Sequence, residues 1–359
     1  MSIKGIFERF EHHAIFVDAW ELSSGHINDT YFIKTEKPPN YILQKINGSV
    51  FKDITGLMNN KMFITEHLRA RYNRTKEYRT VTFIKTRDQK NYYKDHKQGC
   101  WCLMLFVEGS RSVEIVTSRH LAKEAGKLYG SFLNHTYPID TNRIAITIPN
   151  FHHMEFRFLE FDASLKNATE ERISLGYKEI TTVKQLKEGM LTLHRLTVAN
   201  KIPIRVTHND TKISNALFDV NDKAICVIDL DTVMPGIIHY DFGDAIRTIC
   251  ANASEDEKDL SKVTFNLDYY YAFTQGFLSS VEHISQVEAD YLAFSSKVMT
   301  FIMALRMLTD FLNNDIYYKT SYATHNLDRA RNQLKLLKEI DTHFDRMKEI
   351  VQECYLGDF

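Results

Sequence analysis

A short polar segment followed by a predicted β-hairpin constrains the fold of this chain more than any other feature. Residues 207–215 read THNDTKISN, and two apolar, β-prone runs separated by an Asn-Asp turn occupy residues 216–228. Such a pattern is typical of a hairpin, which returns the chain to the place where it began. We therefore expect Asn215, before the first strand, and Asp229, after the second, to lie side by side, with Asp210 on the loop that leads to them.

These residue types suit the transfer of a phosphoryl group. Asp210 can accept the proton of an attacking hydroxyl, while the amide oxygen of Asn215 and the carboxylate of Asp229 can hold a magnesium ion. Lys212 would place a positive charge near the transferred group, and a solvated surface lysine is the alternative. We expect His208 to brace the loop, because Asp210 already provides a base. The alternative for the whole segment is a polar loop in which Asp and Asn only form turns.

The composition is that of an ordinary globular protein. The chain has 359 residues, of which 44% are hydrophobic and 25% charged, with a formal net charge of −1. This balance gives no indication of nucleic-acid binding, and we expect no association with membranes, because no apolar run is long enough to span one. An odd number of cysteines without regular spacing, and an N-terminus without a signal-peptide pattern, favour the cytoplasm. The composition is compatible with a monomer and leaves the oligomeric state open.

Hydrophobic periodicity changes character near residues 106–110. Before this point, β-like segments occupy residues 30–34, 41–46, 79–86, 91–94 and 101–107, with one helical pattern at 54–71. After it, helical patterns occupy residues 119–133, 186–199, 265–277, 289–312 and 327–350. We therefore predict an α+β fold with two lobes, a small β-rich lobe over residues 1–108 and a larger, mostly helical lobe over residues 109–359.

Two further segments contain candidate ligand-binding residues. Residues 25–31 read GHINDTY and precede a predicted strand, so a turn there could bring backbone N–H groups, Asn28 and Thr30 to a nucleotide phosphate. With a single glycine, the segment is also compatible with a plain β-turn.

A helical segment that is apolar nearly all round contains Arg306. Such a helix is buried, and a buried arginine needs a partner or a ligand. An ion pair with Asp310 or Asp315 is one interpretation. A polar pocket shared with Tyr317 is the other.

In several segments the chain resembles the aminoglycoside phosphotransferase and choline kinase superfamily, which has a two-lobed, protein-kinase-like fold. The resemblance covers GHIN at 25–28, YILQ at 41–44, RVTHNDTK at 205–212, IDLDT at 228–232, MPG at 234–236, DFGD at 241–244, EDEKDLSKV at 255–263, DIY at 315–317 and HN at 325–326. The longer segments resemble the N-acetylhexosamine 1-kinase branch. That resemblance implies transfer of the γ-phosphoryl group of ATP, with Mg²⁺, to the anomeric hydroxyl of N-acetylglucosamine or N-acetylgalactosamine.

The resemblance also implies residue roles. Asp210 would be the base, and Asn215 and Asp229 would bind magnesium. The sugar would be recognised by His26, Asp210, Arg306 and Tyr317. Asp241 begins the sequence DFG, with which protein kinases bind metal, but it lies too far beyond Asn215 for a single hairpin return. We expect Asp241 to brace the catalytic loop by hydrogen bonds instead.

One departure concerns the nucleotide. Protein kinases hold the α- and β-phosphates with a lysine on the third strand, which pairs with a helix glutamate. Here Gln44 takes the place of that lysine, as it also does in the resembled sugar kinases, and Lys45 points to the opposite face of the strand. Glu66 on the following helix is therefore not expected to form the usual ion pair. We assign Gln44 to the nucleotide site, with the adenine near Phe106 at the hinge.

Two alternatives stay open. The first is a kinase of the same superfamily with choline, homoserine or an aminoglycoside as acceptor. An amine acceptor would need an acidic or aromatic cage, whereas His26, Arg306 and Tyr317 suit hydroxyls and an acetamide carbonyl. The second is a non-catalytic protein that binds a nucleotide or a sugar, which the departure at Gln44 would favour. The sequence does not choose between the two sugars, or between ATP and GTP.

Overall fold

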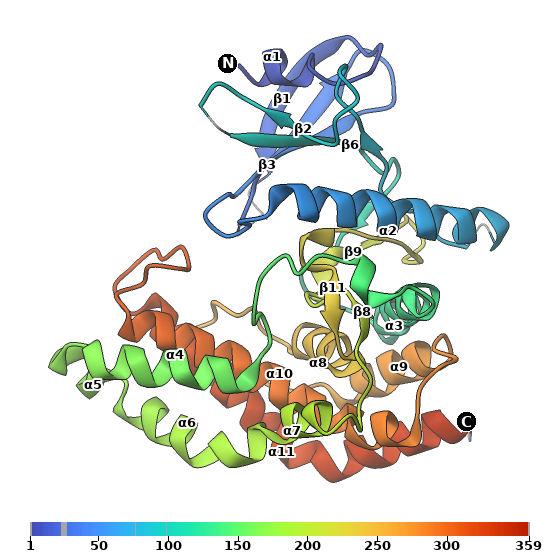
Figure 1. The fold of residues 1–359 in the computed structure, drawn as a ribbon. Helices are drawn as coiled ribbons and strands as arrows, with labels where there is room; N and C mark the ends of the chain where they lie inside the picture. Colours follow the sequence, from blue (N-terminus) through green and yellow to red (C-terminus); the bar gives the residue numbers. More distant parts are fainter. Residues whose placement is uncertain (1, 23–26, 76, 98, 358–359) are drawn as a thin grey trace.

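The computed structural model describes residues 2–22, 27–75, 77–97 and 99–357. It has a small lobe built on one antiparallel sheet and a larger helical lobe below it, with a long helix, α2, between the two (Figure 1). This arrangement confirms the predicted two-lobed α+β fold. His26, assigned to the sugar from the resemblance, lies outside the described residues.

The small lobe, here called the N-lobe, contains the sheet and two helices. Its strands are β1 (Phe16–Leu22), β2 (Asp29–Thr35), β3 (Tyr41–Ile46), β4 (Phe83–Ile84), β5 (Tyr93–Lys94) and β6 (Cys100–Leu105), and its helices are α1 (Ile3–Phe7) and α2 (Ile54–Thr75). The strand order is β1-β2-β3-β6-β4, and β5 also pairs with β6. All five segments predicted as β-like contain a strand, but β1 was missed because its side chains are mostly exposed and do not alternate between apolar and polar.

The larger lobe, here called the C-lobe, is mostly helical. Its helices are α3 (Arg119–Thr136), α4 (Met154–Asn167), α5 (Glu170–Leu175), α6 (Tyr177–Met190), α7 (Thr192–Val198), α8 (Ile238–Ile249), α9 (Leu267–Leu278), α10 (Gln286–Leu312) and α11 (His325–Leu356). Its short strands are β7 (Arg111–Ser112), β8 (Arg205–Thr207), β9 (Ala216–Phe218), β10 (Ala224–Val227) and β11 (Met234–Gly236). The expectation that no apolar run is long enough to span a membrane needs correction, because helix α10 is long and apolar enough by composition. Most of its apolar window is buried within the lobe.

The helix predictions need correction at several places. The helix expected over residues 186–199 is two helices, α6 and α7, because the chain bends at Leu191. Helices α1, α4, α5 and α8 were not predicted. Residues 241–243 were interpreted only by their likeness to the DFG sequence of protein kinases, and they lie within α8.

Helix α2 belongs to the N-lobe in sequence but packs into both lobes. Its buried residues Ile64, Leu68 and Tyr72 join the largest apolar cluster of the C-lobe. Leu57 and Met58, near its start, pack beneath the sheet instead. The helix therefore fixes the position of the sheet above the C-lobe, as Figure 1 shows.

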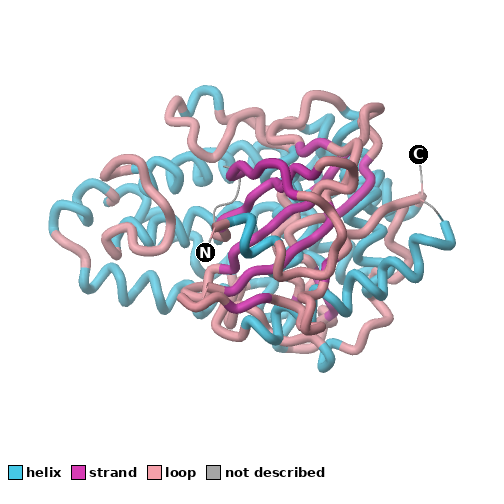
Figure 2. The backbone as a smooth tube through the Cα atoms, turned by 90° about the horizontal axis from the view of Figure 1, so that it is seen from above, coloured by secondary structure: helices cyan, strands magenta, loops and turns pink. Residues whose placement is uncertain are grey.

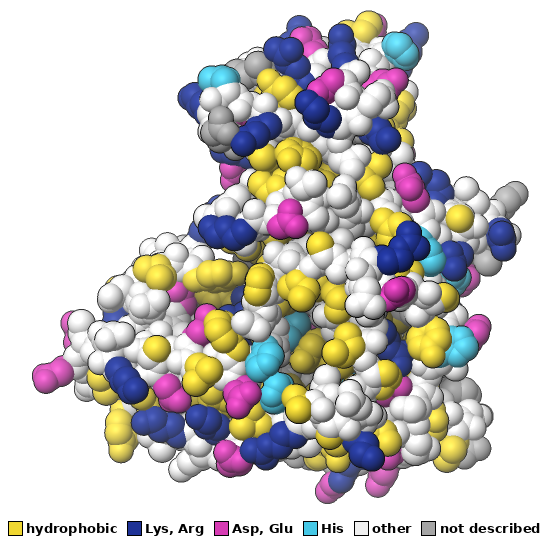
Figure 3. Space-filling model, viewed as in Figure 1, with side chains coloured by type: hydrophobic (Ala, Val, Ile, Leu, Met, Phe, Trp, Pro, Cys, Tyr) yellow, Lys and Arg dark blue, Asp and Glu magenta, His cyan; other side chains and the backbone are white. Residues whose placement is uncertain are grey.

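The connection between the lobes is short. The chain passes from β6 to β7 between residues 105 and 111, and the predicted lobe boundary at residue 108 falls in this connection. Seen from above, the sheet lies over part of the C-lobe, and helices extend beyond it (Figure 2). In the space-filling view the outline narrows between the two lobes, and apolar side chains are visible there (Figure 3).

Candidate active site

The segment after β8 is held by a carboxylate of helix α8. The backbone N–H groups of His208 and Asn209 donate to the two oxygens of Asp241, at 2.8 and 2.7 Å. Thr211 donates from its hydroxyl to the backbone oxygen of Asp241 at 2.5 Å. Asn209 has a φ of +64°, a conformation that asparagine tolerates better than most residues. Through these contacts Asp241 holds the segment in place, and its role in supporting catalysis stays a prediction.

His208 is also a brace. Its Nε2 lies 2.9 Å from the backbone oxygen of Ile228, and its Nδ1 accepts from the N–H of Asp210 at 3.3 Å. A neutral imidazole with the proton on Nε2 satisfies both contacts. Because both ring nitrogens are engaged and the side chain is fully buried, His208 ties the loop to the end of β10 and is not free to move a proton.

Asp210 is the partly exposed acid of this loop, with 28% of its side chain accessible. Asn215 donates from Nδ2 to Oδ2 of Asp210 at 3.0 Å and to its backbone oxygen at 2.8 Å. The ammonium of Lys212 lies 3.5 Å from the same carboxylate. Burial opposes ionisation, but the charge of Lys212 and the hydrogen bond from Asn215 bring the pKa of Asp210 below its ordinary value. The acid is therefore ionised and fixed in direction.

The hairpin brings Asn215 and Asp229 together as predicted. Strands β9 and β10 pair in antiparallel register, and the N–H of Ile228 donates to the backbone oxygen of Asn215 at 2.9 Å. Asp229 follows with a φ of +58°, in the left-handed region of the backbone, and its side chain is exposed. Partial removal from water and the nearby charge of Asp231 raise the pKa of Asp229 to about 7.

These two residues fit a divalent cation. The carboxylate of Asp229 forms no hydrogen bond or ion pair with any residue in the described ranges, and its charge is disfavoured by neighbouring acids. Because Asn215 directs its NH₂ group to Asp210, its amide oxygen remains available. Carboxylate and amide oxygens are the ligands that hard divalent cations prefer.

A second buried cluster joins Asp231 of the C-lobe to residues of the N-lobe. Asp231 is 4% exposed, forms an ion pair with Lys61 of α2, and accepts from the side chain of Asn28, directly before β2. Lys61 Nζ also lies 3.4 Å from Oε1 of Gln44. Gln44 in turn points Nε2 at the hydroxyl of Thr30, 3.5 Å away. Gln44 and Thr30, both assigned to the nucleotide, are thus neighbours.

The other residues assigned to the nucleotide site are placed differently. Both ends of the Asn28 side chain are engaged within the protein, since its oxygen accepts from the N–H of Asn47 at 2.8 Å. The Phe106 ring packs edge-on against Phe32 at 5.0 Å, and its N–H donates to Asn40. Phe106 therefore lies between β6 and the C-lobe, where the hinge was expected.

Lys45 of β3 and Glu66 of α2 are placed as we expected from the sequence. Lys45 lies on the opposite face of β3, 3.9 Å from a carboxylate oxygen of Asp29 and above the ring of Trp101. Glu66 is exposed, and no ion pair joins it to any described residue. The usual pairing of a strand lysine with a helix glutamate is therefore replaced here by another arrangement.

Arg306 lies in an aromatic setting. Its guanidinium carbon is 4.9 Å from the ring centre of Phe151 and 5.7 Å from those of Tyr317 and Tyr318. The ion pairs considered from the sequence are not formed, because Asp310 accepts from the backbone and from Asn326. Asp315 pairs with Arg172 instead. Within the described ranges, Arg306 has no carboxylate partner. The resemblance placed Tyr317 in the same site, and the structure brings the two side chains together.

A family comparison agrees with this geometry. Residues 19–260 match the model of the phosphotransferase enzyme family. The chain belongs to this family. The match runs from strand β1 to the segment after helix α8, so it includes Asp210, Asn215 and Asp229 but not Arg306 or Tyr317.

Solved structures show the same fold at low sequence identity. An aminoglycoside phosphotransferase from Alicyclobacillus acidocaldarius is 12% identical, with a TM-score of 0.64 over 98% of this phosphotransferase and 97% of that chain. A microcompartment-associated aminopropanol kinase is 13% identical, with a TM-score of 0.60 over 96% and 97% of the two chains. An amicoumacin kinase in complex with AMP-PNP and Ca²⁺ is 14% identical, with a TM-score of 0.58 over 94% and 96%.

His152 is a residue of this phosphotransferase that sequence reasoning missed. It is 6% exposed, and its Nε2 lies 2.8 Å from the backbone oxygen of Asn209, next to Asp210. Burial lowers the pKa of His152 to about 3, so the ring is neutral. Lys61 was missed as well. Each contact spans a long sequence separation, and no local pattern points to either residue.

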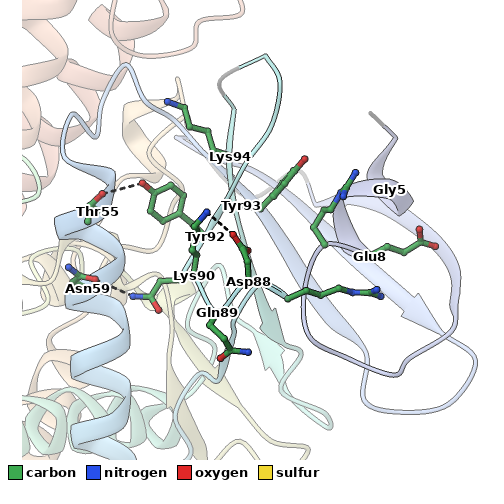
Figure 4. A pocket seen from close by; sticks show the side chains of 13 residues that line it. Gly5, Glu8, Thr55, Asn59, Asp88, Gln89, Lys90, Tyr92, Tyr93 and Lys94 are labelled. Atoms are coloured by element: carbon green, nitrogen blue, oxygen red, sulfur yellow. Dashed lines mark hydrogen bonds and ion pairs between the residues drawn. The ribbon is translucent and has the colours of Figure 1, made fainter.

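An open hollow of about 1090 Å³ lies elsewhere, against α1 and the first turns of α2 (Figure 4). Thr55 and Asn59 of α2 meet Tyr92 and Asn91 at its wall, both at 3.1 Å. It is lined by ionic groups of both signs and by none of the predicted site residues. We assign no role to this hollow.

A second group of possible metal ligands lies at α4 and α7. The ligand atoms of His153, Glu155 and His194 lie within 4.8 Å of one another. Nδ1 of His153 accepts from the N–H of Phe156 at 3.1 Å, so the neutral ring carries its proton on Nε2. Neither nitrogen of His153 can then offer a lone pair to a cation, and we assign no metal to this group.

Proposed function

We propose that this phosphotransferase transfers the γ-phosphoryl group of ATP to the anomeric hydroxyl of an N-acetylhexosamine. The observation that carries the proposal is the Asp210 carboxylate, which is ionised, fixed by Asn215 and partly exposed beside Lys212. Such a group can orient a hydroxyl and take its proton. A non-catalytic protein would have no need for this acid in this state.

In the proposed reaction, the acceptor oxygen forms a bond to the γ-phosphorus while the bond between that phosphorus and the ADP oxygen breaks. The hydroxyl proton passes to Asp210. Lys212, 3.5 Å from Asp210, places a positive charge beside the transferred group. Asn215 and Asp229 would hold Mg²⁺, which when bound neutralises charge on the nucleotide phosphates. Asp241 and His208 keep the loop in one conformation, so that the base and the acceptor meet in a fixed geometry.

Arg306 supports the proposed acceptor class. Its guanidinium has aromatic neighbours and no carboxylate partner in the described ranges, so it can donate to a carbonyl or hydroxyl oxygen. Arg157 also acts on Arg306 electrostatically, but its own guanidinium is paired with Glu160 at 2.6 Å. The charge of Arg306 itself repels a cationic acceptor. This charge supports a neutral sugar with an acetamide group over an aminoglycoside, choline or an amino alcohol.

The test is phosphoryl transfer from ATP with Mg²⁺ to N-acetylglucosamine, N-acetylgalactosamine and choline, with the product identified by phosphorus NMR. We expect an anomeric phosphate on one or both sugars. Asp210→Asn should reduce kcat by at least about a thousandfold while the protein stays folded. A product from choline alone would overturn the substrate, and near-normal turnover of Asp210→Asn would overturn the mechanism.

A further inference from the structure

The side chain of Lys61 reaches the place on β3 where protein kinases carry a lysine for the nucleotide phosphates. Lys61 lies on α2 and is 1% exposed, and its Nζ is 3.4 Å from Oε1 of Gln44. In protein kinases the strand provides the lysine and the helix provides the carboxylate. Here the helix provides the lysine, and Asp231 of the C-lobe provides the carboxylate. A positive charge is therefore present beside β3 despite the glutamine.

Hydrogen bonds fix the direction of the Gln44 amide. Its Oε1 faces two donors, the ammonium of Lys61 at 3.4 Å and the thiol of Cys102 at 3.8 Å. An amide oxygen only accepts and the NH₂ group only donates, so these contacts set Oε1 towards Lys61. Nε2 consequently points to Thr30, 3.5 Å away. Gln44 thus directs N–H donors away from the core and towards the start of β2.

We propose that Lys61 is a positioning residue for the nucleotide, which replaces the missing strand lysine by acting through Gln44 and Asp231. Its charge lies behind Oε1 and polarises the amide, which strengthens the N–H donors offered to the phosphates. This inference rests on the proposed ATP-dependent function, but it involves neither the acceptor nor the base Asp210.

Asp231 gives Lys61 a second effect on the site. It lies two residues after Asp229, and it is held from the N-lobe by both Lys61 and Asn28. A buried ion pair by itself is weak evidence of stabilisation, because the loss of hydration offsets much of the attraction. The position of this pair is more informative, since it connects α2 and the beginning of β2 to the segment that would hold the metal.

The first experiment removes the charge without leaving a buried ion unpaired. Lys61→Met alone would strand the carboxylate of Asp231, so the main variant is Lys61→Met with Asp231→Asn, which neutralises both partners. Calorimetric titration with ADP in magnesium buffer measures nucleotide binding without an acceptor. We expect the Kd for ADP and the KM for ATP to rise about tenfold or more, with the KM for the acceptor unchanged.

A relocation variant tests whether the charge itself matters. Gln44→Lys with Lys61→Met returns the lysine to the strand, beside the same Asp231. We expect ADP affinity to recover to within about threefold of wild type. Lys45→Met is the matched control, because Lys45 is the neighbouring lysine on the opposite face of β3, 43% exposed, and its loss should leave the Kd unchanged.

Gln44→Met keeps the test decisive if the double variant Lys61→Met with Asp231→Asn does not fold. It removes the amide from a half-buried position and keeps the ion pair, so it should weaken ADP binding to a similar extent. The proposal would be overturned if folded Gln44→Met, or the folded double variant Lys61→Met with Asp231→Asn, bound ADP with wild-type affinity. It would also be overturned if the relocation variant folded but did not recover ADP affinity. If these binding effects appear but no acceptor is phosphorylated, the proposed function fails and the role of Lys61 stands.

Discussion

A methyl group added to helix α8 should disturb the active site from a distance. Gly243 lies two residues after Asp241, where α8 packs against α10. A Cβ atom at this position would lie 2.3 Å from the backbone oxygen of Ser295 and 2.7 Å from Cγ of Met299. Ordinary contacts begin near 3.4 Å, so Gly243→Ala requires α8 to move away from α10 by about 1 Å.

The expected effects follow from that displacement. Overpacking of this kind costs about 1–3 kcal/mol, and the better helix propensity of alanine returns up to about 1 kcal/mol. We therefore expect the free energy of unfolding to fall by about 1–2 kcal/mol. A shift of about 1 Å would carry Asp241 away from the N–H groups of His208 and Asn209, and a misplacement of that size can lower kcat by about a hundredfold.

Gly189→Ala is the matched control. Gly189 lies within α6, and a Cβ there would meet nothing within 4 Å. Alanine should stabilise this position by about 0.5–1 kcal/mol, with kcat unchanged. Urea unfolding and steady-state turnover measure both variants. Gly243→Ala with wild-type stability and turnover would refute the link between the packing of α8 and the geometry of the catalytic loop.

Two more predictions concern charge. Burial lowers the pKa of His239 to about 3. On acidification the unfolded chain therefore takes up the proton first, near pH 6.5, and the folded protein loses stability as the pH falls from there towards 3. Urea unfolding at pH 7.5 and at pH 5 measures this loss. Between these two pH values the free energy of unfolding of His239→Gln should fall by about 2 kcal/mol less than that of wild type, and equal losses would contradict the prediction. Arg306→Met should raise the acceptor KM about tenfold without changing the ATP KM, and an unchanged acceptor KM would exclude Arg306 from the acceptor site.

The hairpin and its flanking residues could be predicted from the sequence because their order is local. Antiparallel strands joined by a short turn must bring Asn215 and Asp229 together, whatever surrounds them. The alternation of a strand likewise separates Gln44 from Lys45, and the structure shows their different neighbours. The roles assigned to these residues in catalysis remain predictions for the experiments above.

Lys61 could not be predicted in the same way. It is one of several polar residues on a long helix, and the sequence does not show which of them faces the sheet. Its partner Asp231 is 170 positions away, so the pair exists only after α2 has packed onto the C-lobe. The sequence predicted a buried Arg306, whereas the structure has this residue half-buried. Its lack of an ion pair with Asp310 or Asp315 could not be predicted, because it depends on the other residues that contact those carboxylates.

Three aspartates within the same stretch of chain show how surroundings decide the role of one residue type. Asp229 is exposed and has no partner among the described residues, so its charge favours an added cation. Asp231 is buried and neutralised by Lys61, and Asp241 is buried against two backbone N–H groups. Because Asp231 is tied to the N-lobe and Asp241 to the catalytic loop, the segment between them is fixed at both ends. A change in the position of α2 would act on Asp231 directly, and Asp229 lies only two residues before it.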